Sequence, residues 1–308
     1  MPDRILDLSE EPAHVSIRNG LLHIKRPVAG ETTLPVDEVG VLVASQPQLS
    51  FTLSALANLS AAGAAVVVCA ENRLPVGLML PLQGNGTQAE RMAAQINTKL
   101  PVKKRLWQSI VRAKIEAQAE TLRCEFGEDG GLKAISETVR SGDPNNREAY
   151  AARRYWLSLM GEEFVRDRHA EDINRVLNYG YTVLRAMTGR AVCASGLHPS
   201  LGVHHHNRYS QFALADDLME PFRPVVDRAA LAIQRIWGAD APLDRTVKTE
   251  LLTALGTRYL YHGERRTLFD IIARLASSLT GIYMGERESL DLPDFTNFYI
   301  DQRGGGSL

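Results

Sequence analysis

Residues 39–70 read VGVLVASQPQLSFTLSALANLSAAGAAVVVCA, and this stretch decides how the first part of the chain folds. Residues 39–44 and 64–70 are short, continuous apolar runs, a pattern typical of strands that are buried on both faces. Between them, residues 50–62 carry leucines three apart and stop before Gly63, which predicts a helix. The loop after the first run has no glycine, so this unit lacks the phosphate-binding turn of nucleotide-binding folds.

Upstream of this unit, the sequence predicts a hairpin. Residues 13–18 alternate between apolar and polar, Asn19-Gly20 supplies a type I′ turn, and residues 21–25 form the returning strand. The segment before the helical part of the chain is therefore predicted to be β-rich.

Downstream, the character of the sequence changes at residues 83–101. Gly84, Asn85 and Gly86 interrupt the pattern and Pro101 closes the stretch, which we interpret as a linker between domains. Beyond it, helical periodicity dominates, with predicted helices at 102–126, 132–140, 144–160, 172–194, 213–236, 245–256 and 267–285.

The predicted fold class is α+β. We expect a small N-terminal β-rich domain, sandwich-like with one helix, followed by a larger all-α C-terminal domain that carries the candidate site. The predicted boundaries are 1–82 for the β domain, 83–101 for the linker, 102–288 for the helical domain and 289–308 for a C-terminal tail.

Composition excludes several classes of protein. Of the 308 residues, 44% are hydrophobic and 23% are charged, which excludes a mainly disordered or fibrous chain. No apolar run approaches the ~20 residues of a membrane span, and the N-terminus lacks an apolar export signal. Cys69, Cys124 and Cys193 fit neither a disulfide framework nor a zinc cluster, so we expect a cytoplasmic protein with no membrane partner.

Positive charge is concentrated in the middle third of the chain. Residues 91–190 have a net charge of +5, against −4 for residues 1–90 and −2 for residues 191–308. Most of these cations are arginines, whose guanidinium groups pair with phosphate in a bidentate fork. The distribution indicates a polyanionic partner, although a solvated basic surface is the alternative.

The first group of residues suited to chemistry is GDPNNREAYAARRYW at 142–156. Asp143 is expected to cap a helix that presents Glu148 beside several arginines. Glu148 is a candidate functional carboxylate. The alternative is a surface ion pair between Glu148 and Arg147 or Arg154.

The second group is GLHPSLGVHHHNRYSQFALADDLMEPFRPVVD at 196–227. A loop with four histidines leads into a helix on which Asp217 and Glu220 project from one face, and two prolines kink that helix. Arg223 is placed to pair with Glu220 or with Asp227. The alternative is an acidic helix start that favours the macrodipole, beside an exposed histidine loop.

Together the two groups predict a mixed oxygen and nitrogen site for a metal ion. Carboxylates favour Mg²⁺ or Mn²⁺, one imidazole moves the preference towards Mn²⁺, and the absence of nearby cysteines argues against zinc. A hard metal ion beside arginines suits phosphoryl transfer on nucleic acid, because the metal activates a water or a 3′-hydroxyl for in-line attack.

The sequence resembles the CRISPR-associated integrase and endonuclease family, Cas1. The resemblance is carried by the string DLMEPFRPVVD at 217–227, which follows a histidine-rich loop, and by NRE at 146–148. Cas1 is the universal adaptation subunit of CRISPR systems, and the type II form is the most similar. The segments ENRLPVGLMLP at 71–81 and YGYTVLRAM at 179–187 also match the family pattern. The triple histidine and the glycine-rich tail depart from it, and the triple histidine offers His204 and His206 as alternative ligands.

The resemblance implies roles for particular residues. It implies that Glu148, His205 and Glu220 are the catalytic metal ligands for Mg²⁺ or Mn²⁺, with Asp217 as a supporting acid. Spacing to Glu220 selects His205, and an extended approach with Leu201 and Val203 on the same inward side would leave His204 and His206 pointing elsewhere.

The resemblance also implies partners and a reaction. It implies a homodimer that joins the small ferredoxin-like protein Cas2 in a heterohexamer, with other type II CRISPR proteins as further partners. The complex would insert captured double-stranded DNA, the prespacer, into the CRISPR array by two transesterifications. Isolated members typically act as metal-dependent DNA endonucleases, that is, as hydrolases of phosphodiester bonds.

Two alternative functions would place the protein in other functional classes. One is a stand-alone nuclease that acts on branched or repair-intermediate DNA, and the other is a non-catalytic DNA-binding scaffold. In each case DNA would be held by basic side chains, for which the candidates are Lys103, Lys104, Arg105, Arg112, Arg147, Arg153, Arg154 and Arg223.

Overall fold

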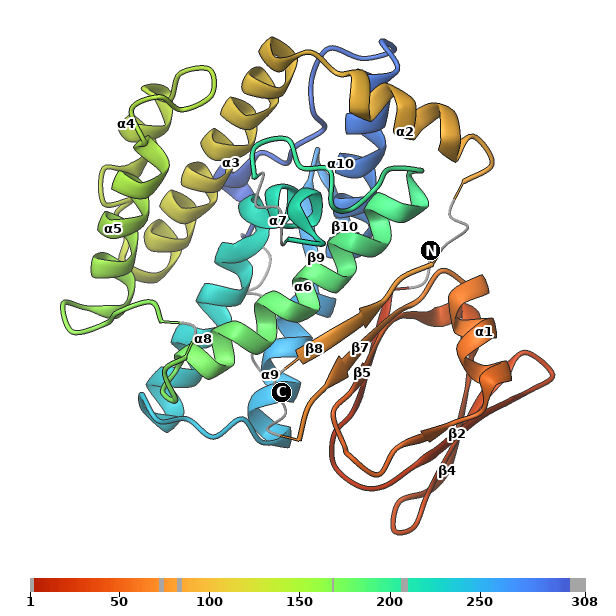
Figure 1. Cartoon of the computed structure of the whole chain (residues 1–308). Coiled ribbons are helices and arrows are strands. Elements are labelled where there is room, and N and C mark those ends of the chain that lie inside the picture. The colour runs from red at the N-terminus through yellow and green to blue at the C-terminus, as the bar shows by residue number, and fades with distance from the viewer. Residues whose placement is uncertain (1–2, 72–74, 82–84, 168, 206–209, 300–308) are drawn as a thin grey trace.

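The computed structural model describes residues 3–71, 75–81, 85–167, 169–205 and 210–299. It has a β-rich N-terminal domain with one helix, drawn in red and orange, and a larger helical domain beside it (Figure 1). The predicted α+β class and the order of the two parts are confirmed.

Two four-stranded sheets build the N-terminal domain. The first has the order β1-β5-β7-β8, in which β1, β5 and β7 are parallel and β8 is antiparallel to β7. The second has the order β4-β3-β2-β6, in which only the β2–β6 pair is parallel. The elements are β1 (Arg4–Leu8), β2 (His14–Arg18), β3 (Leu21–Arg26), β4 (Gly30–Pro35), a 3₁₀ turn (Val36–Glu38), β5 (Val39–Ala44), β6 (Ser50–Phe51), α1 (Leu53–Ala61), β7 (Ala65–Cys69) and β8 (Pro75–Met79).

The predicted hairpin is the β2–β3 pair. Asn19 and Gly20 both have positive φ, 51° and 74°, which is the requirement of a type I′ turn. Arg18 consequently pairs with Leu21, and the two strands stay in register from there.

Strand β5 and the first three residues of β7 are buried on both faces, as predicted, whereas Val68 near the end of β7 is 45% exposed. Leu42 and Val66 face the core between the two sheets, where they join Val15 of β2. Val41 and Val67 face the other way and belong to the core of the helical domain, where α6 packs against both strands. The apolar runs are continuous because one face of this sheet forms the boundary between the domains.

The helical domain is built around α3 and α6. Its elements are α2 (Gln88–Asn97), α3 (Leu100–Phe126), α4 (Leu132–Glu137), α5 (Arg147–Met160), α6 (Asn174–Ala194), α7 (Ala213–Met219), a 3₁₀ turn (Glu220–Phe222), α8 (Arg223–Trp237), α9 (Arg245–Gly256), β9 (Arg258–Tyr261), β10 (Glu264–Thr267), α10 (Leu268–Tyr283) and a 3₁₀ turn (Phe295–Asn297). In the described part of the chain, no helix combines the length and apolarity needed to cross a membrane.

Two features of this domain differ from the sequence prediction. The domain predicted to be all-α contains the antiparallel β9–β10 hairpin, because His262 and Gly263 form a turn with φ of 48° and 83°. The segment predicted as a linker, 83–101, contains α2, which packs against α10 and buries Gln95. Residues 88–97 are mostly strong helix formers, and that signal is in the sequence.

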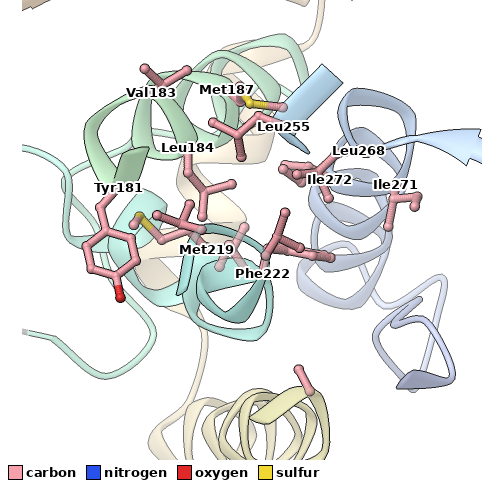
Figure 2. Close-up of a cluster of buried hydrophobic side chains, with 14 of the residues drawn as sticks. Tyr181, Val183, Leu184, Met187, Met219, Phe222, Leu255, Leu268, Ile271 and Ile272 are labelled. Atoms are coloured by element: carbon pink, nitrogen blue, oxygen red, sulfur yellow. The ribbon is translucent and has the colours of Figure 1, made fainter. Parts of the chain in front are cut away.

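The helix predicted at 213–236 is broken into α7, a 3₁₀ turn and α8. Pro221 and Pro224 lack the amide hydrogens that a continuous helix would use, so the break falls where they lie. Met219 and Phe222 at the break are fully buried. They pack among side chains from α6, α9 and α10, including Leu184 and Ile272 (Figure 2). This core fixes the backbone on which Glu220 sits.

Candidate metal centre

Glu148 lies in the first turn of α5, as predicted. Asp143 turns back on the start of that helix, and its carboxylate accepts hydrogen bonds from the backbone amides of Arg147 and Glu148, both at 2.9 Å. Asp143 thus satisfies two amides that have no partner within the helix. The cap fixes the direction in which Glu148 leaves the helix, towards α3.

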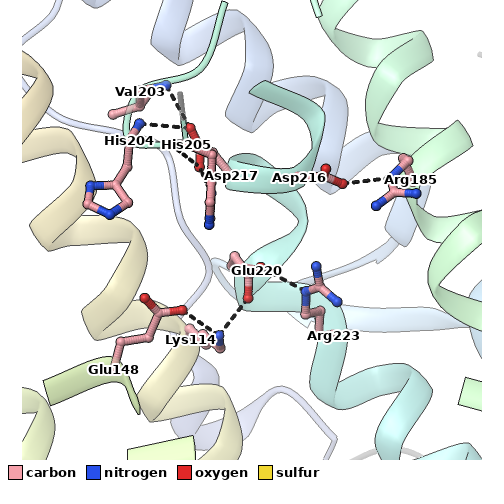
Figure 3. A network of polar contacts seen from close by, with 10 residues as sticks. All are labelled: Lys114, Glu148, Arg185, Val203, His204, His205, Asp216, Asp217, Glu220 and Arg223. Atoms are coloured by element: carbon pink, nitrogen blue, oxygen red, sulfur yellow. Dashed lines mark hydrogen bonds and ion pairs between the residues drawn. The ribbon is translucent and has the colours of Figure 1, made fainter. Parts of the chain in front are cut away.

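Glu220 begins the 3₁₀ turn between α7 and α8, and its side chain is only 7% exposed. It reaches the same point as Glu148. The ammonium Nζ of Lys114, from α3, lies 2.6 Å from Glu148 Oε1 and 2.7 Å from Glu220 Oε2 (Figure 3). The predicted surface pairing of Glu148 with Arg147 or Arg154 is replaced by this buried bridge. We call Glu148 and Glu220 the carboxylate pair.

Arg223 completes the surroundings of Glu220. Its Nε donates to Glu220 Oε1 at 2.9 Å, which confirms one of its two predicted pairings. The other predicted pairing, with Asp227, is not a direct ion pair among the described residues, although the charge of Arg223 acts to lower the pKa of Asp227. The buried carboxylate of Asp227 instead accepts hydrogen bonds from the hydroxyls of Tyr155 and Tyr181, and burial raises the pKa of Asp227 to about 7.

Charges in the site are strongly coupled. Burial by itself would raise the pKa of Glu220, but the nearby Arg223 and Lys114 outweigh it and lower the pKa to about 2. Burial by itself would lower the pKa of Lys114, but attraction to Glu220 and Glu148 outweighs it and raises the pKa. Glu220 is therefore anionic and Lys114 carries a charged ammonium at neutral pH.

Asp217 anchors the loop that carries the histidines. Its side chain is fully buried, and Oδ2 accepts from the amides of Val203 at 2.6 Å and His204 at 2.9 Å. Oδ1 contacts Nδ1 of His205 at 2.5 Å. This hydrogen bond, opposed by desolvation, raises the pKa of His205. A carboxylate that holds one ring nitrogen leaves the other free to bind a metal, the arrangement usual for metal-binding histidines.

The orientation of the loop follows from this anchor. In Figure 3 the ring of His205 extends from Asp217 towards Glu220, whereas the ring of His204 lies to one side. His204 stacks on Trp107 of α3, with ring centroids 4.2 Å apart and planes 4° from parallel. His206 lies outside the described residues.

The extended approach predicted for this loop is wrong. Val203 is buried, but Leu201 is 36% exposed and does not share its inward side. The amides of Val203, His204 and His205 all point at Asp217, so the backbone curls around one carboxylate instead of alternating like a strand.

Helix α2 holds the beginning of the same loop, a role that the sequence analysis missed. The buried amide of Gln95 donates to the carbonyls of His198 at 3.1 Å and Leu201 at 2.9 Å, and its oxygen accepts from the amide of His198. Arg91 donates to the carbonyl of Ser195 at 3.1 Å. The segment interpreted as a linker therefore positions the histidine loop.

The basic side chains predicted to hold DNA fall into two groups. Arg112 donates to the carbonyl of Val139 and Arg223 to Glu220, so both are engaged inside the protein. Arg154 donates to the carbonyl of Gly130 although its side chain is exposed. The remaining candidates are exposed or partly exposed, namely Lys103, Lys104, Arg105, Arg147 and Arg153.

The residues present suit a hard divalent cation. Glu148 and Glu220 already converge on one positive charge, and His205 is oriented by Asp217 towards the same space. Among the residues that the structure describes, no three His, Cys, Asp or Glu side chains close on a common point. The ammonium of Lys114 lies between Glu148 and Glu220. Two carboxylates with one imidazole are the donor set that favours Mg²⁺ or Mn²⁺.

Gly202 provides a test of the loop geometry. A Cβ at this position would lie 2.5 Å from the carbonyl oxygen of His205 and 2.9 Å from Asp217 Oδ2, so the loop would have to move. We expect Gly202→Ala to lower the DNA cleavage that the family resemblance implies by about a hundredfold, because small displacements of a positioned group have effects of that size. The measurement is initial cleavage rate, with folding checked by thermal melting.

Gly256→Ala is the matched control for that substitution. Gly256 ends α9, has open space around its Cβ position and does not have a positive φ. The control should keep wild-type activity and the same or a higher melting temperature. Wild-type cleavage by Gly202→Ala would show that the close packing of the loop is unimportant.

These features define a class of protein. It is a two-domain α+β protein in which two glutamates and a histidine, Glu148, Glu220 and His205, lie where α3, α5 and α7 meet. The family model described as CRISPR associated protein Cas1 matches residues 6–237. The CRISPR-associated endonuclease Cas1 of Neisseria meningitidis serogroup C (strain 8013) is 34% identical over 267 residues, which cover 85% of this chain and 87% of that relative. The chain therefore belongs to the Cas1 family, and the resemblance seen in the sequence is confirmed.

Two solved structures share the fold. One, titled "Casposase bound to integration product", has a TM-score of 0.78 and 21% identity, covering 97% of this chain and 95% of that chain. The other is a chain of a "Cas6-RT-Cas1--Cas2 complex", with a TM-score of 0.73 and 19% identity, covering 96% of this chain and 36% of that chain. The arrangement of a β domain and a helical domain is thus common to these proteins.

Proposed function

We propose that this protein is a metal-dependent DNA endonuclease and integrase of CRISPR adaptation. It would use Mg²⁺ or Mn²⁺ held by Glu148, His205 and Glu220, and would join captured double-stranded DNA to a CRISPR array by transesterification. The observation that carries the proposal is the convergence of Glu148 and Glu220 on one cation, with His205 directed to the same space by Asp217.

Each residue of the site has a distinct task in this proposal. A bound divalent ion supplies Lewis acidity to a phosphate oxygen and lowers the pKa of a water or a 3′-hydroxyl. Glu148 and Glu220 provide hard oxygen donors, and Arg223 fixes the orientation of Glu220 through Oε1. His205 provides a nitrogen donor. Asp217 holds Nδ1 of His205 and the loop amides, so it acts as a positioning residue.

The proposed partners are DNA and Cas2. The named activity of the Neisseria relative is that of an endonuclease, and one structure of the same fold is from a complex that contains Cas2. We propose that this chain forms a homodimer and joins Cas2 in a heterohexamer, beside other type II CRISPR proteins. The exposed cations Lys104, Arg105 and Arg153 are proposed to contact the DNA backbone.

The test is integration of a labelled prespacer into a supercoiled plasmid that carries a CRISPR array, with the full chain and Cas2. We expect products with Mg²⁺ or Mn²⁺ and none with EDTA. Products should also vanish when the prespacer ends lack the 3′-hydroxyl, because that oxygen is the nucleophile.

Other outcomes of this assay would contradict the proposal. Cleavage of branched DNA without Cas2, together with no integration under any condition, would indicate a stand-alone nuclease. DNA binding with neither cleavage nor integration in any divalent metal would indicate a non-catalytic scaffold.

A further inference from the structure

Lys114 occupies the centre of the candidate site, between the carboxylate pair formed by Glu148 and Glu220. Its Nζ lies 2.6 Å from one carboxylate and 2.7 Å from the other, and its side chain is 13% exposed. The residue sits in the middle of α3, whose neighbouring positions Ala113 and Ile115 are buried in the core. The long side chain therefore extends from a fixed backbone into a space lined by acids from α5 and the α7–α8 break.

The negative charges of the carboxylate pair are already neutralised by neighbouring side chains. The two carboxylates are matched by two cations, Lys114 and Arg223. A divalent ion on the same oxygens would stand within a few ångströms of both cations, where like charges repel strongly in a buried setting. One of the two must withdraw from the carboxylates when the ion binds.

The contacts of Arg223 and Lys114 indicate that Lys114 is the cation that withdraws. Arg223 donates to Glu220 Oε1, the oxygen that Lys114 does not touch, and its guanidinium lies over the ring of Tyr181, 4.7 Å from the centroid. Lys114 instead bridges the two oxygens that face each other across the site. A lysine is also a compact point charge on a flexible four-carbon stem, which moves more easily than a stacked guanidinium.

We propose that Lys114 is the resident cation of the metal-free site and that it is displaced when a divalent ion binds the carboxylate pair. This inference rests on the proposed function, because it takes the carboxylate pair as the metal site. Lys114 thus acts as a positioning residue that keeps two mutually repelling carboxylates in place before the metal arrives.

Direct competition for the same oxygens predicts the effect of removing the charge. Lys114→Met keeps the length and apolar stem of the side chain without the ammonium. We expect this variant, without DNA, to bind Mn²⁺ about tenfold more tightly than the wild type. We also expect the metal-free variant to melt at a lower temperature, since the carboxylates lose their counterion, and to recover stability when Mn²⁺ is added.

The experiment measures Mn²⁺ binding to the full chain by calorimetry and by electron paramagnetic resonance. It compares the wild type with Lys114→Met, Lys114→Gln and the control Lys133→Met, whose lysine is exposed on α4. The control should bind Mn²⁺ as the wild type does. Equal or weaker Mn²⁺ binding by both Lys114 variants would overturn the proposal.

A second measurement uses the unaltered protein and so does not depend on the folding of a variant. Lysine acylation followed by mass spectrometry should show that Lys114 becomes several times more reactive when Mn²⁺ is added, while Lys133 does not change. Unchanged protection of Lys114 at saturating Mn²⁺ would contradict displacement.

The failure of this inference can be distinguished from failure of the proposed function. If the wild type binds Mn²⁺ and integrates DNA but Lys114 stays protected, only the displacement is wrong. If the wild type neither binds Mn²⁺ nor reacts with DNA, the metal site itself is wrong.

Discussion

Replacement of Glu220 by glutamine is expected to lower metal-dependent cleavage and integration about a thousandfold or more. The change removes a proposed anionic oxygen donor to the metal, and a metal that polarises a phosphate lowers the activation barrier by several kcal/mol. DNA affinity should stay the same or rise slightly, because a negative charge near the phosphates is lost. The two effects together separate a metal ligand from a residue that merely maintains the fold.

Stability must be measured beside activity in this variant. Glu220 is the partner of both Lys114 and Arg223, so glutamine leaves two buried cations with a weaker acceptor. We expect a loss of about 1–3 kcal/mol in the free energy of unfolding, measured by denaturant titration.

Asp216→Asn is the matched control for Glu220→Gln. Asp216 lies on α7, and its carboxylate pairs with Arg185 on α6, away from the carboxylate pair (Figure 3). The control should retain activity within about twofold, since surface ion pairs contribute little. Equal loss of DNA binding and activity in Glu220→Gln would mean that Glu220 is structural.

The second large effect is expected at His205. His205→Ala should lower Mn²⁺-dependent activity at least about a hundredfold, because it removes the proposed nitrogen donor to the metal and leaves Asp217 without the ring that it orients. His204→Ala should cost much less. It removes a ring that stacks on Trp107, worth about 0.5–1.5 kcal/mol of stability, while the backbone amide of residue 204 still donates to Asp217.

The measurement is a parallel series of cleavage, integration and Mn²⁺ binding assays on His204→Ala, His205→Ala and His206→Ala, with thermal melts for each. His206→Ala is also expected to retain most activity. An inactive His204 or His206 variant beside an active His205 variant would show that the assignment of the ligand is shifted by one residue. The family assignment would be unaffected.

Local signals in the sequence were sufficient for much of the fold. Asn19-Gly20 predicted the β2–β3 turn because both residues adopt positive φ. The prolines at 221 and 224 predicted a kink in the helix at 213–236, since each lacks an amide hydrogen, and the structure separates α7 from α8 at that place. Glu148 also lies on its predicted helix, although that helix begins at Arg147 with Asn146 at its N-cap. Asp143, the predicted N-cap, lies three residues earlier and still accepts from the amides of Arg147 and Glu148. In each case a short stretch of chain determines its own backbone.

The parts that could not be predicted depend on contacts between distant segments. Lys114 and Glu220 are more than a hundred residues apart, and periodicity placed Lys114 only within the helix predicted at 102–126. Gln95 holds the carbonyls of His198 and Leu201, although its segment looked like a linker because Gly84 and Gly86 precede it. A hydrogen bond from a side chain to the backbone of a distant segment produces no recognisable pattern in a single sequence.

The most direct test of the central claim is the anomalous diffraction of manganese in crystals of the protein grown or soaked with Mn²⁺. The account predicts one strong anomalous peak bounded by Glu148, His205 and Glu220, with the ammonium of Lys114 moved away from the two carboxylates. A peak at another place in the molecule, or no peak with Lys114 still bridging Glu148 and Glu220 at saturating Mn²⁺, would contradict it.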